Sequence, residues 1–214
     1  MAHSLRPRPD QELSDTAEPG LPPSASGDAG FQIAPFRPED AETIASWVTT
    51  PEELLWLAPA TPPPLTAEKV RGWALPNVAA YAMTESATGD LVGYAELNRM
   101  ERDPHHQWIG HVIVRRDRRG RGLGGHLVAD LLHRAAGEGA AARVSLIVCP
   151  DNAAAIQCYK RAGFDIVCDE LHRFGRPPRP LRMLRLEWRA SNRCHDTTPL
   201  ERSGSHPATG RRRG

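Results

Sequence analysis

The apolar positions of this chain recur with two different periods, and the period changes repeatedly between residues 31 and 189. Short runs of alternating or continuous apolar residues, bounded by turn residues, predict strands at 31–36, 78–86, 91–100, 107–114, 143–148, 164–169 and 181–188. Apolar stripes at the helical period predict helices at 38–48, 51–57, 66–75, 122–137 and 151–163. This alternation of element types predicts an α/β or α+β fold, with a mixed sheet and helices on both of its faces.

The two ends of the chain differ from this core in composition. Residues 1–30 are rich in Pro, Gly and Ser and contain no aromatic residue, and the stretch from about residue 191 to 214 is again polar and broken by Pro and Gly. Such segments bury too little apolar surface to offset their ordering entropy. We therefore expect disordered tails at 1–30 and 191–214 around one folded domain at 31–190.

Composition excludes several classes of function. The formal net charge of the 214 residues is +1, which gives no overall field for nucleic acid or an anionic membrane. No apolar run approaches the roughly 18 residues that span a bilayer, and the N-terminus has no apolar segment of a secretory signal. The four cysteines form no C-x-x-C pair, so we predict no metal site, reduced thiols and a cytoplasmic location.

A glycine- and arginine-rich loop, "RRDRRGRGLGGHL" at 115–127, joins an apolar strand to a helix. The first N–H groups of a helix have no partner inside it, and the helix dipole favours negative charge there. Gly120, Gly122 and Gly124 would let the backbone approach a phosphate, and Arg119 and Arg121 would add charge. The loop matches neither the P-loop nor the dinucleotide pattern, so on its own it is a phosphate site or a simple glycine-rich turn.

A second block decides between these readings. "NAAAIQCYKRAGF" at 152–164 follows about 30 residues later. Together, "RGRGLG" after the strand "HVIV" and the pattern N-x-x-A-x-x-x-Y-x-x-x-G-F strongly resemble the GNAT family of acyl-CoA-dependent N-acyltransferases, and the region 110–167 is RimI-like. The resemblance implies a mixed, mainly antiparallel central sheet flanked by helices on both faces, and acetyl-CoA as the cosubstrate.

The resemblance also implies which residues hold the cofactor. The strand before the glycine loop would separate from its neighbour, so that backbone groups of Val112, Ile113 and Val114 hold the pantetheine arm. The pyrophosphate would lie on the loop, at Arg119, Gly120, Arg121, Gly122, Leu123 and Gly124. Asn152 matches the asparagine that binds the cofactor arm, although it could equally be the N-cap of the next helix.

Tyr159 matches the tyrosine that protonates the leaving thiolate in this family, and its alternative role is that of a core aromatic. We favour the acid, because the motif surrounds it. The chemistry also needs a base, because an acceptor amine with a pKa of about 8 to 10.4 is mostly protonated at neutral pH.

The general base is less evident. The positions that often carry it in the family hold Trp108 and Gly110, and the glutamate of ribosomal-protein acetylases corresponds to Ile147. The remaining candidates are Glu96 and His111. His111 alternates onto the face of Ile109 and Ile113 and could be a core histidine, whereas an acid within a strand is costly to bury without purpose, so we favour Glu96.

We therefore predict an N-acetyltransferase that moves an acetyl group from acetyl-CoA to a primary amine by direct attack in a ternary complex. The acceptor is a small-molecule or protein amine, and the protein is a monomer or homodimer. The alternative is a non-catalytic acyl-CoA-binding or regulatory module that has lost its base. His105 and His106, at a strand entrance, are predicted to be surface residues.

Overall fold

The computed structural model describes residues 30–137 and 141–190, so the tails predicted at 1–30 and 191–214 lie outside the described residues except for Gly30. The described residues form a seven-stranded sheet in the order β1-β2-β3-β4-β5-β7-β6. Its strands are β1 (Phe31–Pro35), β2 (Val78–Glu85), β3 (Leu91–Arg99), β4 (His106–Val114), β5 (Arg143–Val148), β6 (Asp165–Phe174) and β7 (Arg179–Arg189). Every neighbouring pair is antiparallel except β4 and β5, which confirms the mixed, mainly antiparallel sheet.

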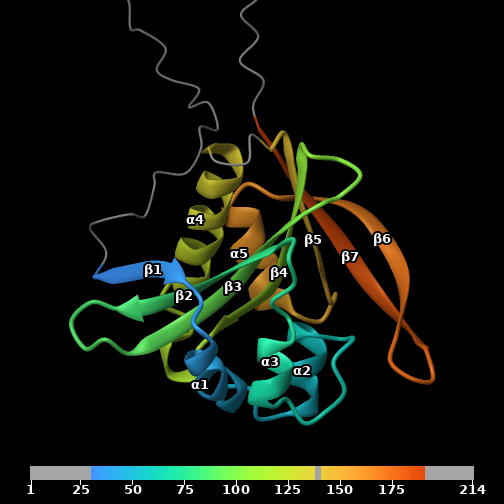
Figure 1. Cartoon of the computed structure of the whole chain (residues 1–214). Coiled ribbons are helices and arrows are strands. Elements are labelled where there is room, and N and C mark those ends of the chain that lie inside the picture. Colours follow the sequence, from blue (N-terminus) through green and yellow to red (C-terminus); the bar gives the residue numbers. More distant parts are fainter. Residues whose placement is uncertain (1–29, 138–140, 191–214) are drawn as a thin grey trace, which may run out of the picture.

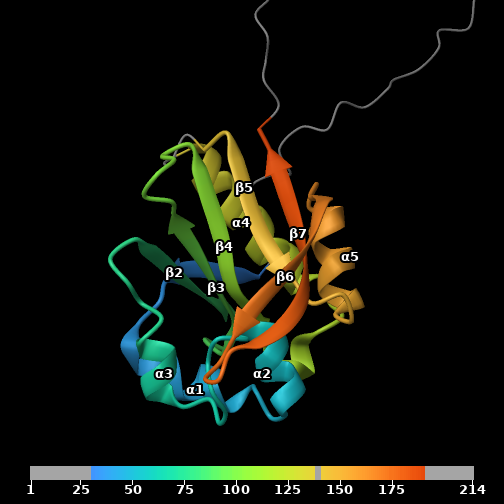
Figure 2. The same ribbon diagram turned by 90° about the vertical axis from the view of Figure 1, so that its right-hand side faces the viewer.

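Helices cover both faces of this sheet, as predicted (Figure 1). The helices of the described ranges are α1 (Ala41–Ser46), α2 (Pro51–Leu57), α3 (Ala67–Arg71), α4 (Leu123–Gly137) and α5 (Ala153–Arg161), with 3-10 turns at Pro38–Asp40 and Arg116–Arg118. α4 and α5 lie on one face, whereas α1, α2 and α3 gather at the lower end of the molecule (Figure 2). No helix within the described ranges is both long and apolar enough to cross a membrane.

Local sequence signals explain most helix ends. The hydroxyl of Thr66 accepts a hydrogen bond from the Lys69 backbone N–H at 3.4 Å and thereby caps the N-terminus of α3. The helix ends at Arg71 and not at residue 75, because Gly72 disfavours helix and the next N–H groups bond three residues back instead of four. Gly163 follows α5 with a φ of 91°, the left-handed conformation of a C-terminal cap.

Two apolar clusters fill the space between the sheet and its helices. The larger one lies beneath α4 and α5 and includes Leu127, Leu131 and Phe164, whereas the smaller one joins α1 and α3 to the opposite face through Ile44 and Tyr94. β3 runs between them and is buried from Leu91 to Leu97. The sheet is therefore enclosed on both faces at β3, the strand that carries Glu96.

Candidate active site

β4 and β5 are paired over only part of their lengths. Their parallel ladder comprises His106 with Arg143, Gln107 with Val144, and Trp108 with Ser145. Beyond Trp108, the β5 edge of β4 has no ladder partner among the described residues, while β5 continues to pair with β7. Backbone groups on that edge, over the segment that contains Val112, Ile113 and Val114, are available to a ligand.

The glycine loop follows directly and presents open backbone. Gly120 and Gly122 have φ values of 75° and 82°, and a Cβ added at either would meet no heavy atom within 4 Å. Gly124 differs, because a Cβ there would approach the Cys158 sulfur to 3.3 Å, so this glycine lets α4 pack closely against α5. The backbone at 120 and 122 thus leaves room for a bulky anion at the N-terminus of α4.

The loop arginines are not equally available. Arg119 donates to the Val114 carbonyl at 2.9 Å and forms an ion pair with Glu53 of α2 at 2.8 Å. The guanidinium of Arg121, by contrast, is exposed and has no partner within the described ranges. Leu123 packs its side chain in the core, which leaves its backbone N–H at the helix start. Arg121 and the helix N–H groups are therefore the free donors of this loop.

Glu53 was not singled out by the sequence, although it anchors this loop. Burial raises its pKa, but hydrogen bonds from the Thr49 backbone N–H, Arg119 and the Thr49 hydroxyl lower it more strongly, to about 2. The carboxylate is ionised at neutral pH and links α2 to Arg119. No sequence signal identified it, because 66 residues separate the two partners.

Asn152 and Tyr159 lie at the two ends of α5. The Asn152 side chain accepts from the Ala155 N–H at 3.2 Å, so its predicted N-cap role is confirmed, and its amide nitrogen remains available. Tyr159 is buried with its ring edge-on to Phe164, and burial raises its pKa. Its hydroxyl has no hydrogen-bond partner among the described residues, yet is not a fully enclosed atom. Tyr159 is thus a core aromatic with a free, protonated hydroxyl.

Glu96 and His111, the two candidate bases, contact one another. The Glu96 carboxylate is 2 % exposed and accepts from the Tyr94 hydroxyl at 2.6 Å through Oε1. Its Oε2 lies 2.8 Å from Nδ1 of His111, whose side chain is 26 % exposed. Burial, followed by the charge of Glu96, raises the pKa of Tyr94, so the hydroxyl stays protonated and donates to the carboxylate.

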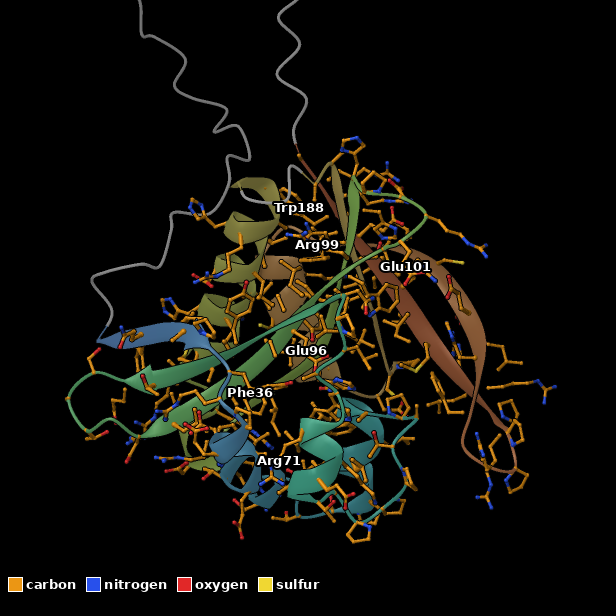
Figure 3. The ribbon with its side chains drawn as sticks, viewed as in Figure 1. Phe36, Arg71, Glu96, Arg99, Glu101 and Trp188 are labelled. Atoms are coloured by element: carbon orange, nitrogen blue, oxygen red, sulfur yellow. The ribbon has the colours of Figure 1, made fainter. Side chains whose placement is uncertain are left out.

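A carboxylate also fills the space beside Gly110, one of the positions that lack the family's base. Gly110 pairs with Glu96 across the β3–β4 ladder, and a Cβ at Gly110 would lie 3.2 Å from Glu96 Oε2. Glu96 lies at the centre of the sheet in Figure 3. A carboxylate therefore lies beside Gly110, although β3 and not β4 carries it.

The prediction that His111 shares a face with both Ile109 and Ile113 is wrong for Ile109, because His111 stacks on Trp73, which packs in the cluster of Ile113, whereas Ile109 lies on the opposite face. His111 has a φ of 40°, and the ladder shifts register between Tyr94 and Glu96, so β4 carries a bulge. Ile109 packs in the cluster beneath α4 and Ile113 in the cluster with α1, which shows that the alternation breaks between them. The bulge turns the His111 ring onto Trp73, with ring centroids 4.1 Å apart.

The prediction that His106 lies at the surface is also wrong. It is 8 % exposed, and its Nε2 lies 2.7 Å from the Ser145 hydroxyl, whereas His105 is exposed as predicted. Burial, followed by the charge of Arg143, lowers the pKa of His106. The cause is the parallel ladder between β4 and β5, which begins at His106 and places its side chain against β5.

A family model described as the acetyltransferase (GNAT) family matches residues 41–164 of this chain. That span contains the glycine loop, both candidate bases, Asn152 and Tyr159. No curated protein sequence matches the chain significantly.

Solved structures match the fold at low sequence identity. A spermidine N-acetyltransferase from Vibrio cholerae, in complex with CoA and spermine, has a TM-score of 0.63 at 13% identity, covering 75% of this chain and 95% of its own. The ribosomal-protein-S5-alanine acetyltransferase from Vibrio fischeri gives 0.62 at 13% identity, over 78% of this chain and 96% of its own. An AAC(6')-Ib structure with paromomycin and acetyl-CoA gives 0.59 at 19% identity, over 75% and 94%.

Proposed function

Since this chain belongs to the acetyltransferase (GNAT) family, it is an acetyl-CoA-dependent N-acetyltransferase, and we propose that His111, held by Glu96, is its general base for a small-molecule amine. The observation that carries the proposal is the 2.8 Å contact between the buried Glu96 carboxylate and the partly exposed His111 ring. This pair supports an enzyme over the non-catalytic module, because the apparent lack of a base was the ground for that alternative.

The pair divides the work of a base between two residues. Glu96 is enclosed by Tyr94 and His111, so it cannot reach an amine itself. Because an ionised carboxylate only accepts hydrogen bonds, it holds the His111 proton on Nδ1 and leaves the lone pair on Nε2. In this proposal His111 Nε2 receives the amine proton, directly or through one water, and Glu96 is a positioning residue.

Tyr159 supplies the second proton event. Its raised pKa keeps the hydroxyl protonated at neutral pH, and that hydroxyl has no partner within the described part of the chain. In the reaction the amine nitrogen forms a bond to the thioester carbonyl carbon and the carbon–sulfur bond breaks. His111 has by then taken one proton of the ammonium group, the departing thiolate takes the Tyr159 proton, and the second proton of the nitrogen returns to the Tyr159 oxygen through water, so that atoms and charge balance once His111 releases its proton to solvent.

The cosubstrate site fits the backbone around the glycine loop. The open positions at Gly120 and Gly122, together with Arg121, would hold the pyrophosphate. Arg119 would contribute backbone, since Glu53 already binds its guanidinium. The unpaired edge of β4 beyond Trp108, over the segment that includes Val112, Ile113 and Val114, would hold the pantetheine arm beside the Asn152 amide.

We further propose that the acceptor carries few positive charges. Solved relatives hold amines such as spermine or paromomycin, which supports a small-molecule acceptor here. However, the β6–β7 turn bears the exposed Arg173, Arg176 and Arg179, without an ion pair in the described ranges, and extends at the same lower end as α2 and α3 (Figure 2). A polycation that approached along the tip of this hairpin would meet like charge.

A cytoplasmic location also belongs to this proposal. Cys149, Cys158 and Cys168 are free thiols, which supports a reducing compartment.

The test is release of CoA thiol from acetyl-CoA with a panel of mono- and polyamines, measured for wild type, His111→Asn and the matched control His133→Asn. His133 is exposed on α4, away from the site. We expect His111→Asn to lower kcat at pH 7 by about 10²- to 10⁴-fold and to recover partly at high pH, where the amine is already neutral. Equal turnover of both variants would refute the base, and no turnover by wild type with any amine would favour the non-catalytic module.

A further inference from the structure

A cavity lies at the far end of β4 from the glycine loop. It measures about 250 Å³ and is walled by the start of β2, the end of β3, the start of β4 and the second half of α4. Its lining includes the apolar Val78 and Leu97 and the polar Asn77, Arg99, Gln107 and Arg134.

The cavity is distinct from the site of acetyl transfer. Gln107 precedes His111 by four residues, or roughly 13 Å along an extended strand. Ile109, two residues after Gln107, packs beneath α4, whereas His111 lies beyond the bulge and stacks on Trp73 of the opposite layer. Figure 3 shows Arg99 near the upper end of the sheet, well above Glu96.

Gln107 is the strongest sign that this cavity binds something. The residue is 3 % exposed, and its side-chain carbonyl oxygen is buried without a hydrogen-bond partner. A buried amide oxygen without a donor is costly, and such groups are rarely left unsatisfied in native proteins. A ligand that brings an N–H or O–H donor would remove that cost.

Arg99 supplies hydrogen-bond donors and a positive charge beside the Gln107 acceptor. It pairs with Gln107 across the β3–β4 ladder, so the two side chains leave the sheet on the same face. Its guanidinium has no partner among the described residues, while its backbone is fixed by reciprocal hydrogen bonds with Asn77. Arg134, the second cation, is ion-paired with Asp130 and lies over the Tyr81 ring. The cavity therefore has, at its solvent-exposed rim, one arginine without an ion pair among the described residues, beside one buried acceptor without a donor.

We propose that this cavity binds an apolar α-amino acid as a ligand that is not acetylated there. The carboxylate pairs with Arg99 in the two-pronged geometry of guanidinium. The ammonium group of the same molecule donates to the Gln107 carbonyl oxygen, and the apolar side chain covers Val78 and Leu97. In an α-amino acid the carboxylate and the ammonium group are neighbours, and in the cavity Arg99 and the Gln107 carbonyl oxygen are neighbours in the same way.

The experiment uses the full chain, labelled with ¹⁵N, and follows the side-chain amide resonance of Gln107, assigned by its loss in Gln107→Leu. The probes are L-leucine, L-isoleucine, L-valine, L-methionine and L-phenylalanine, with 4-methylpentanoate and 3-methylbutylamine as half-molecules of leucine. We expect at least one amino acid to shift this resonance, and each matching half-molecule to bind at least tenfold more weakly. An unshifted resonance with all five amino acids overturns the proposal, as does equal binding of a half-molecule.

Variants then test the two contacts by calorimetry. Arg99→Met and Gln107→Leu should each weaken amino-acid binding at least tenfold, whereas Arg102→Met, an exposed arginine three positions along the chain, should not. Gln107→Leu should also raise the melting temperature of the ligand-free protein, because it removes an unsatisfied buried oxygen. Undiminished binding in both cavity variants would refute the assignment, and the wild-type half-molecule comparison stands even if one variant does not fold.

Discussion

Replacement of Gly110 by alanine should disable the Glu96–His111 pair without touching either residue. The added Cβ would lie 3.2 Å from Glu96 Oε2 and 3.2 Å from Asn98 Nδ2, closer than ordinary van der Waals contact. The carboxylate cannot retreat easily, because its other oxygen is held by Tyr94 at 2.6 Å and the residue is 2 % exposed. We expect a shift of Oε2 by a few tenths of an ångström, which would disturb its 2.8 Å contact with His111 Nδ1.

The size of the effect follows from the contact that is weakened. A hydrogen bond to a charged group contributes about 1.5–3 kcal/mol, and a shift of a few tenths of an ångström loses part of it. A loss of about 1–2 kcal/mol in the positioning of His111 corresponds to roughly a 5- to 30-fold lower kcat. This is smaller than the loss from removing His111 itself, because the imidazole remains present.

The assay is steady-state thiol release at pH 7, with CoA binding measured by calorimetry on the same protein. Gly137→Ala is the matched control, since a Cβ there meets nothing within 4 Å. In the His111→Asn background, Gly110→Ala should lower kcat no further, because the two changes act on one interaction. A folded Gly110→Ala variant with wild-type kcat, or full additivity of the two substitutions, would refute the coupling.

Three other substitutions test the rest of the site. Tyr159→Phe should lower kcat by about 10²-fold, the low end for a general acid because a thiolate can depart unaided, with little change in KM; unchanged kcat would return Tyr159 to a purely structural role. Gly122→Glu should weaken CoA binding in a folded protein, because its φ of 82° and open backbone would receive a Cβ and a negative charge; calorimetry with unaltered affinity would exclude this loop. Glu53→Gln should lower the free energy of unfolding at pH 7 by at most about 3 kcal/mol, since the folded pKa of about 2 lies below the ordinary 4.5. Its stabilisation is complete above pH 4.5 and fades as the pH falls towards 2, so urea unfolding curves that differ equally at pH 7 and pH 2.5 would contradict this origin.

The parts of the fold that the sequence predicts are those set by contiguous residues. The glycine loop, the N-cap of α5 at Asn152 and the C-terminal cap at Gly163 each depend on a conformation that only a few residue types favour. Strand and helix ranges follow from apolar periodicity. The predicted ends of α3 and β6 are wrong, and in β6 the sequence from Glu170 to Arg173 shows no apolar alternation although β7 pairs with it.

The partners that complete the site come from elements far apart in the chain. Trp73, which stacks on His111, follows α3, and Glu53, which binds Arg119, belongs to α2. Neither Trp73 nor Glu53 belongs to a sequence motif that predicts its role. Only Tyr94 left a usable signal, because residues two apart in a strand share a face and Tyr94 therefore had to lie beside Glu96.

The candidate base is formed by two paired strands, β3 and β4, and cannot be identified from the sequence of β4 alone. Gly110 looks like an empty catalytic position when β4 is considered alone. In the ladder it lies opposite Glu96, and its lack of a side chain is what admits the Glu96 carboxylate. The bulge at His111 then adds one residue to β4, which reverses the face of the histidine and brings its Nδ1 to the same carboxylate. Gly110, which looks like an empty position in the linear sequence, and the positive φ of His111, which only the structure shows, together allow Glu96 and His111 to meet.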